Sequence, residues 1–271
     1  MEITKRETMV SVIIFFILLG LGFLIHNLII ENYILEVEKY NKALKIDNSV
    51  ELFKYSIDTE VGNILVYGKF SADSGISFDE LKNDYTCLRK ETEEYRRHSR
   101  QVCETDSKGN EHCRTEYYYS WDIINTETKS VKKVIFLEKK YDYSLFNNYP
   151  EYRLDIASNV VDSKKSYVKN NYLYKDKNGL FGADVGDIRY YYYYTPKDFM
   201  GTIFIKAKNK TIFNVNNSGS IPINNNDLNT TIENKKNQET IINIVFWIIW
   251  ITLTGLAIYG YVYLDNDYLE D

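Results

Sequence analysis

The chain has 271 residues and a formal net charge of −5, from 33 basic and 38 acidic side chains. Without the two basic and six acidic residues near its ends, residues 31–240 hold 31 basic and 32 acidic side chains. So balanced a charge argues against nucleic acid or an anionic lipid surface as the main partner. The 25 tyrosines and only three prolines favour strands over disorder, because aromatic residues fit pleated, half-buried surfaces.

Two long apolar segments lie at opposite ends of the chain, at Met9–Ile30 and Ile241–Leu264. Each exceeds the roughly 20 residues that a helix needs to cross a bilayer core, so we expect two transmembrane helices. A cleavable signal peptide is the alternative for the first segment, but the run is long and no A-x-A-like site follows it. Apart from His26, neither segment carries a His, Asp, Glu, Lys or Arg residue, which argues against transport.

Charge does not decide which side of the membrane the central block occupies. Two basic residues precede the first span, whereas five lie near the spans within residues 31–240, which taken literally predicts a cytoplasmic block. The positive-inside rule loses force for loops longer than about 60 residues, and this block is far longer. Orientation therefore depends on other features.

Residues 31–240 show strand patterns between two helical ends. Tyr33, Val37, Tyr40 and Leu44 form one apolar stripe, which predicts a helical stalk that packs on its own domain, with a coiled-coil dimer as the alternative. A second short helix is expected near 50–55, a loop over 209–229, and a linker helix before the second span. The strands are expected at 62–70, 84–103, 112–124, 131–137, 152–157, 188–195 and 201–207.

These patterns predict an α+β membrane protein in which two transmembrane helices flank a β-rich ectodomain with a long hairpin. The expected parts are a short cytoplasmic tail (1–8), transmembrane helix 1 (9–30), a membrane-proximal helical stalk (31–57), the β-rich domain (58–215), a loop and linker helix (216–240), transmembrane helix 2 (241–264) and an acidic cytoplasmic tail (265–271).

The hairpin is expected to turn at Asp106–Asn110, where Gly109 suits the left-handed position of a three-residue loop. With the turn centred on Lys108, favourable cross-strand pairs arise in one register, and each contributes about 0.2–1 kcal/mol. The pairs are Cys103–Cys113, Arg100–Glu116, Glu104–His112, Arg97–Tyr119 and Tyr95–Trp121. Glu94 opposite Asp122 is discordant, so the register is expected to slip beyond that pair.

Cys103 and Cys113 face each other in this register, where two cysteines approach disulfide distance. Such a bond would place the domain outside the cytoplasm. The alternative is a pair of reduced cysteines on exposed strands. Cys87 is left over and is expected to be a buried, inert thiol.

The sequence offers no assembled chemistry. The C-x(2–4)-C and H-x(3–5)-H spacings of zinc sites, and the hydrolase motifs G-x-S-x-G and H-E-x-x-H, are missing from it. We therefore expect no enzyme activity, no cofactor and no metal. Five consecutive tyrosines, 190–194, must alternate between the two faces of a sheet, and a sugar-binding platform is one alternative. The residues expected to form an interaction surface are Arg97, Tyr119, Trp121, Tyr190, Tyr192 and Tyr194.

The hairpin segment that begins at Tyr85 and the segment VGDIRYYYYY (185–194) resemble the LUMA family, that of transmembrane protein 43. The resemblance covers about residues 60–215 and implies a membrane-proximal, extracytoplasmic β-rich domain in a membrane organiser or scaffold. LUMA proteins carry several C-terminal spans, whereas this chain has one. Segments at Tyr40, Val61 and Trp247 are more similar to two-span proteins of low-GC bacteria and phages, and a distant likeness extends to GIDE-type membrane domains.

These observations predict a non-enzymatic integral membrane protein whose extracytoplasmic β-rich domain binds a partner or scaffolds a membrane complex. The expected partners are the lipid bilayer and another membrane or envelope protein, or a second copy of the chain, and no nucleic acid. One alternative is an envelope-stress or phage-exclusion sensor that acts through oligomerised spans. Another is an ectodomain hydrolase of envelope glycans or peptides.

Overall fold

Two long terminal helices frame the molecule. The computed structural model describes residues 4–161, 166–175, 182–216 and 219–270. Helices α1 (Lys5–Lys42) and α4 (Leu228–Glu270) lie side by side and antiparallel, and both are long and apolar enough to cross a membrane. A capping box starts α1, because the Thr4 hydroxyl accepts from the Glu7 amide and the Glu7 carboxylate accepts from the Thr4 amide.

The helix pair is held by close contacts along its length. Gly22 lets α4 approach, since a Cβ built there would lie 2.3 Å from Trp250 Nε1. That indole nitrogen donates to the Leu18 carbonyl at 3.0 Å. Nearer the domain, His26 lies 2.7 Å from the Asn243 side chain. Small residues at such a crossing allow the van der Waals packing that drives helix association in lipid.

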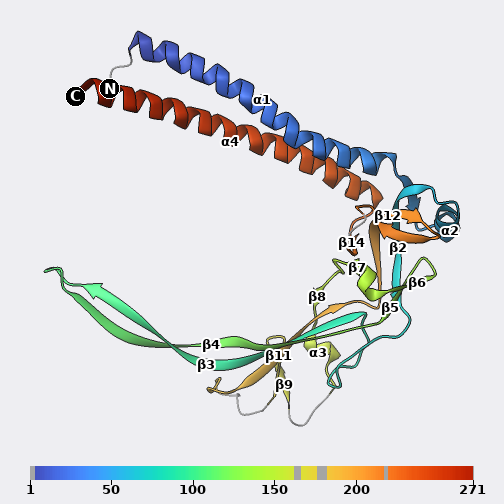
Figure 1. Cartoon of the computed structure of the whole chain (residues 1–271). Coiled ribbons are helices and arrows are strands. Elements are labelled where there is room, and N and C mark those ends of the chain that lie inside the picture. Colours follow the sequence, from blue (N-terminus) through green and yellow to red (C-terminus); the bar gives the residue numbers. More distant parts are fainter. Residues whose placement is uncertain (1–3, 162–165, 176–181, 217–218, 271) are drawn as a thin grey trace.

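An eight-stranded sheet follows the helix pair (Figure 1). Its path runs β6-β5-β2-β12-β14-β7, with β1 beside β2 and β13 beside β12. The strands are β1 (Leu44–Asp47), β2 (Gly62–Ala72), β5 (Lys133–Phe136), β6 (Lys139–Asp142), β7 (Phe146–Asn147), β12 (Asp198–Lys208), β13 (Thr211–Asn214) and β14 (Ile221–Asn224).

Alternating side chains of β2 reach two different cores. Ile64 and Val66 join Phe70 in the main core, which helix α2 (Val50–Asp58) covers through Phe53. Leu65 points to the opposite face, where Ala43 and Ile232 from the bases of α1 and α4 cover it. The eight-stranded sheet is thus packed between α2 and the foot of the helix pair. Aromatic contacts reinforce the main core, with Phe70 lying 4.4 Å from Phe136 and 5.0 Å from Phe199 between ring centroids.

A six-stranded sheet forms the far part of the domain, in the order β4-β3-β11-β10-β9 with β8 beside β11. Its core side is filled by Phe78, Leu88, Ile156 and Tyr192, and a short helix, α3 (Ile156–Asn159), lies there. The strands are β3 (Cys87–Thr105), β4 (Glu111–Ser130), β8 (Tyr152–Arg153), β9 (Tyr167–Lys169), β10 (Tyr172–Tyr174) and β11 (Ile188–Thr195).

The hairpin of β3 and β4 extends far beyond this sheet, in roughly the same direction as the helix pair (Figure 1). Strand β11 pairs with β3 only as far as Glu94. We call the remainder the free arm, residues 96–105 of β3 paired with residues 111–120 of β4. At its turn, Gly109 has φ +84° and the Asp106 carboxylate accepts from the Lys108 and Asn110 amides at 2.8 and 2.9 Å.

The hairpin register follows the sequence-based prediction throughout the free arm. The pairs Cys103–Cys113, Arg97–Tyr119 and Tyr95–Trp121 all occur, and the slip comes just beyond Glu94–Asp122. There Glu93 pairs with Ile123 but Thr92 pairs with Asn125, so Ile124 is a bulge residue. The register could be predicted because the turn at Asp106–Asn110 fixes the alignment and places opposite charges and aromatic rings across from each other.

Other elements differ from the expectation. The predicted loop over 209–229 is wrong, because β13 and β14 form there and pair with β12. The predicted strand over 152–157 is strand only at Tyr152–Arg153 and then turns into α3. Short strands in Asn-rich stretches lack the length and alternation that single-sequence patterns need. Before β11 the chain turns at 184–187, where the Asp187 amide donates to the Asp184 carbonyl at 3.0 Å.

Candidate functional site

The six residues expected to form an interaction surface divide between the two faces of the six-stranded sheet. Arg97, Tyr119 and Trp121 lie on the face that points away from the main packing of that sheet, together with Arg189, which stacks on Trp121. Tyr190, Tyr192 and Tyr194 lie on the other face, where Tyr192 is fully buried. The structure therefore brings together the first three and separates them from the tyrosines.

Arg189 is the centre of the first face. Its guanidinium carbon lies 4.1 Å from the ring centroid of Trp121 and 3.8 Å from that of Tyr172, so the side chain is held between two rings. Its Nε donates to Glu93 at 2.5 Å, and both side chains are more than four-fifths buried. The result is a rigid unit of one cation, one anion and two rings.

Further arginines and rings extend this unit over β8 and β11. Arg153 lies 5.0 Å from the Tyr172 ring and 5.3 Å from the Tyr191 ring. The Tyr191 hydroxyl donates to Glu91, and burial, aided by the negative charge of Glu93, raises the pKa of Tyr191. A neutral tyrosine that donates to a carboxylate is thereby favoured at physiological pH.

The same pattern continues outward along the free arm. Tyr95 stacks near Tyr119 at 5.9 Å between centroids and contacts Trp121 at 5.2 Å. Arg97 lies 4.0 Å from the Tyr117 ring. Tyr117 and Tyr119 are 58% and 50% exposed, so rings at this end are open to solvent. We define the aromatic–arginine face as Arg97, Tyr117, Tyr119, Trp121, Arg153, Tyr172, Arg189 and Tyr191.

The opposite face of β11 is a buried structural site. The Tyr192 hydroxyl and Lys90 Nζ both donate to Glu80, each at 2.6 Å. Burial alone would raise the pKa of Glu80, but these hydrogen bonds outweigh it, and the net shift is downward. Burial also raises the pKa of Tyr192, and the bond to Glu80 adds to that rise. This network fastens β11 to the segment around Glu80.

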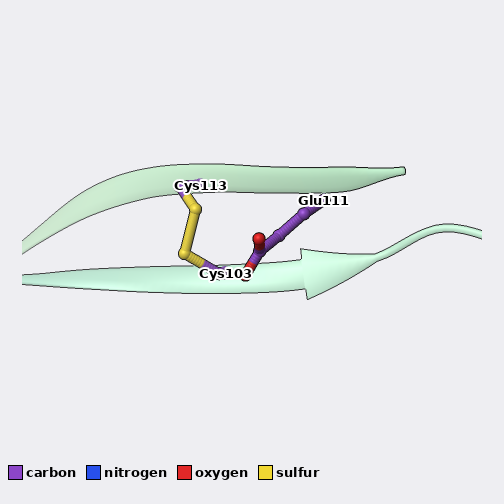
Figure 2. A group of neighbouring side chains, drawn as sticks. All are labelled: Cys103, Glu111 and Cys113. Carbon is purple, nitrogen blue, oxygen red and sulfur yellow. A yellow bond between two sulfur atoms is a disulfide. The ribbon is translucent and has the colours of Figure 1, made fainter. Parts of the chain in front are cut away.

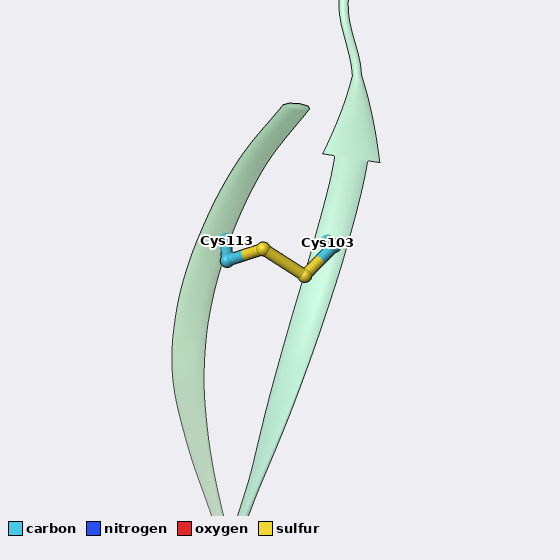
Figure 3. The surroundings of a disulfide bond; sticks show 2 residues. All are labelled: Cys103 and Cys113. Carbon is cyan, nitrogen blue, oxygen red and sulfur yellow. A yellow bond between two sulfur atoms is a disulfide. The ribbon is translucent and has the colours of Figure 1, made fainter. Parts of the chain in front are cut away.

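Near the tip of the free arm, Cys103 and Cys113 form a disulfide (Figures 2 and 3). Their Cα atoms are 4.0 Å apart, and both residues are exposed. The Glu111 carboxylate lies within 4.8 Å of both sulfurs, pointing toward them (Figure 2). A metal would need thiolates, so the oxidised pair acts here as a covalent cross-link of the two strands. Cys87, the remaining cysteine, is half-buried and free.

Sequence reasoning missed the centre of the aromatic–arginine face. Arg189, Tyr191 and Arg153 were not among the candidates, although Arg189 and Tyr191 alternate with the tyrosines that were. In the strand sequence IRYYYYYT, alternate side chains point to opposite faces of the sheet. Both faces carry tyrosines, so the pattern does not indicate which face is packed. The arginine at 189 is the available signal, since a charged side chain marks the less buried face.

Comparisons with family models, curated proteins and solved structures find no match for this chain. The geometry of the described residues is therefore the main support for a function. It gives two apolar terminal helices that are compatible with membrane integration and a β-rich domain with an open, arginine-rich aromatic surface.

Proposed function

We propose that this protein is a membrane-anchored binding protein, non-enzymatic, whose extracytoplasmic β-rich domain holds or organises a partner protein at the membrane surface. The observation that carries the proposal is the aromatic–arginine face. Tryptophan, tyrosine and arginine are the residues that dominate binding energy at protein interfaces. Here they stand together on one face, partly exposed and already ordered by their mutual contacts.

Preorganisation is the physical reason that such a face binds well. Ordering a flexible side chain at an interface costs about 0.5–1.5 kcal/mol. Arg189 is already fixed by Glu93, Trp121 and Tyr172, so a partner does not meet that cost for it. The arginines retain N–H donors for the carboxylates or carbonyls of a partner, while the rings supply apolar area.

The extracytoplasmic location is part of the proposal and draws its support from the disulfide. Disulfides persist in oxidising compartments and are rare in the cytosol. Cys103 and Cys113 are exposed, so in a reducing compartment their bond would be accessible to reductants. The resemblance of the hairpin to the LUMA family points to the same side of the membrane and to a scaffolding role.

The test is chemical cross-linking in native membranes followed by affinity purification of the full chain. Trp121→Ala and Tyr119→Ala are compared with Tyr55→Ala, a control on α2 whose tyrosine is 61% exposed and far from this face in the fold. A hot-spot side chain contributes at least about 2 kcal/mol, which is roughly a 30-fold loss of affinity. We expect one partner to be recovered with the wild type and the control and lost with both face variants. Equal recovery with all four proteins would refute the proposal.

A further inference from the structure

The outer edge of β4 is open, and its free backbone groups can be assigned. Strand β4 is the terminal strand of the six-stranded sheet. Cα atoms of directly opposed antiparallel residues are closest at non-hydrogen-bonded pairs, and the 4.0 Å between Cys103 and Cys113 identifies such a pair. Alternate residues from there have N–H and C=O groups that point away from β3. They are Cys113, Thr115, Tyr117, Tyr119, Trp121 and Ile123.

The hydrogen bonds of Tyr95 confirm this assignment. Its amide donates to the Asp187 carbonyl and its carbonyl accepts from the Gly186 amide, each at 2.9 Å, on the side away from β4. Tyr95 is opposite Trp121, so that pair is also non-hydrogen-bonded and the Trp121 groups point outward. No strand of the described chain pairs with this edge between Glu111 and Ile123.

We propose that the outer edge of β4 is a self-association site, at which the β4 strands of two copies pair antiparallel about a two-fold axis centred on Tyr118. A two-fold axis pairs outward-pointing residues of one copy with outward-pointing residues of the other. Because these residues all have odd numbers, the two numbers of each pair add up to an even sum, and the axis passes through a residue. The side chains of β4 then select among a few registers.

Centring the axis on Tyr118 gives a register with two arginine–carboxylate pairs and no charge repulsion. Arg114 of each copy then faces Asp122 of the other, Tyr117 faces Tyr119, and Thr115 faces Trp121. No like charges oppose each other between Glu111 and residue 125. Opposite-charge and aromatic cross-strand pairs stabilise a sheet, whereas directly opposed like charges destabilise it.

An axis at Tyr117 also avoids repulsion, but it places Arg114 opposite Ser120 and so loses the Arg114–Asp122 pairs. The registers on the other side are worse for definite reasons. An axis at Tyr119 places Glu116 opposite Asp122 and Glu111 opposite Glu127, which are two repulsive pairs in each half of the interface. An axis at Ser120 avoids repulsion but extends the paired segment past the bulge at Ile124, where alternation fails. The register centred on Tyr118 uses residues 113–123, all of which precede the bulge.

Of the common devices that block edge pairing, this edge carries charged side chains, at Arg114, Glu116 and Asp122. Natural sheets shield edges with proline, bulges or inward-pointing charges, and the sequence from Glu111 to Ile123 has no proline or bulge. Six outward residues in each copy supply about 12 hydrogen bonds between the strands. The free arm is otherwise a two-stranded ribbon, which is marginally stable alone and gains a four-stranded context from the dimer.

The direction of the free arm limits how two copies held in a membrane by α1 and α4 can pair. The arm and the helix pair run in roughly the same direction (Figure 1), so antiparallel β4 strands direct the two helix pairs to opposite sides. An arm that runs along the helices points toward its own bilayer, so it would not reach a copy in a facing membrane. Pairing within one membrane needs a two-fold axis along the membrane normal and the arm lying along the bilayer surface.

The test uses the full chain with a photo-reactive phenylalanine analogue at Tyr118, and at Tyr55 as control, in reconstituted vesicles. The expected product is a covalent homodimer from position 118 and none from position 55. Differently tagged copies in shared vesicles should give the mixed homodimer, and copies in separate vesicles should not. Absence of the homodimer, or an adduct with a different protein only, overturns the proposal.

Charge exchange tests the register independently of folding. Arg114→Asp places two acidic side chains opposite each other across the interface, and Asp122→Arg places two basic ones opposite each other. Each substitution should lower the homodimer yield at least fivefold. The double exchange restores opposite charges and should restore the yield. Within one chain these residues lie eight positions apart on one strand, so an effect on folding alone would not be rescued. Thr115→Pro removes an outward N–H without breaking the β3–β4 ladder and should also abolish the dimer. Unchanged dimer in all single variants, or no rescue, overturns the proposal and leaves the aromatic–arginine face untouched.

Discussion

Removal of the Cys103–Cys113 disulfide should loosen the free arm without unfolding the domain. The bond closes a loop with a sequence separation of 10, for which the chain-entropy relation gives about 2.7 kcal/mol. No third strand of the described chain holds the free arm, so its opening is a local event that the cross-link opposes. At about 1.4 kcal/mol per factor of ten, opening should become up to roughly 90-fold more frequent.

Hydrogen exchange followed by mass spectrometry measures this change peptide by peptide. In the variant with Cys103→Ser and Cys113→Ser, amides of residues 96–105 and 111–120 should exchange up to roughly 90-fold faster. Amides of β2 should keep their wild-type rates, because the main core does not contact the arm tip. Cys87→Ser, which changes a free thiol, is the matched control. Unchanged exchange in the arm, or equal acceleration in β2, would show that the disulfide does not stabilise the arm locally.

Three further predictions concern the helix pair, the main core and the buried tyrosines. Gly22→Leu should drive the helices apart at Trp250. Gly20→Leu should not, because no atom lies within 4 Å of a Cβ built at Gly20. Cross-linking between the two helices measures the difference. Phe70→Ala should lower the free energy of unfolding by about 3–5 kcal/mol, measured by denaturant titration, since Phe70 is fully buried. The raised pKa of Tyr192 keeps it neutral in the folded state, so stability should be full below pH about 10 and fall above it. Ultraviolet titration should show a tyrosine class that ionises only with unfolding; reversible titration of every tyrosine in the folded protein would contradict this.

The parts of the fold that the sequence predicted are those with long, one-sided patterns. The apolar end segments gave the two long helices, and charge pairing around Lys108 gave the hairpin register. Strands β9, β10, β13 and β14 escaped prediction because each has only three or four residues. Their pairing depends on partners that are distant in the chain, such as β12 for β14, and local propensity does not encode it.

Only part of the candidate site could be predicted from the sequence. Arg97, Tyr119 and Trp121 follow from the hairpin register, which local pairing determines. The stacking of Arg189 between Trp121 and Tyr172 needs three strands brought together by the fold, and no spacing in the sequence indicates it. Which face of β11 is packed depends likewise on the segment around Glu80, about a hundred residues earlier in the chain.

The location of the domain is tested most directly by thiol labelling in intact cells. After mild reduction, a membrane-impermeant maleimide is added to cells that express either the wild type or the variant with Cys103→Ser and Cys113→Ser. Because both cysteines are exposed, an extracytoplasmic domain predicts strong labelling of the wild type before lysis and its loss in the variant. Labelling of Cys103 and Cys113 only after the membrane is broken would place the binding face in the cytoplasm and contradict the proposed extracytoplasmic location.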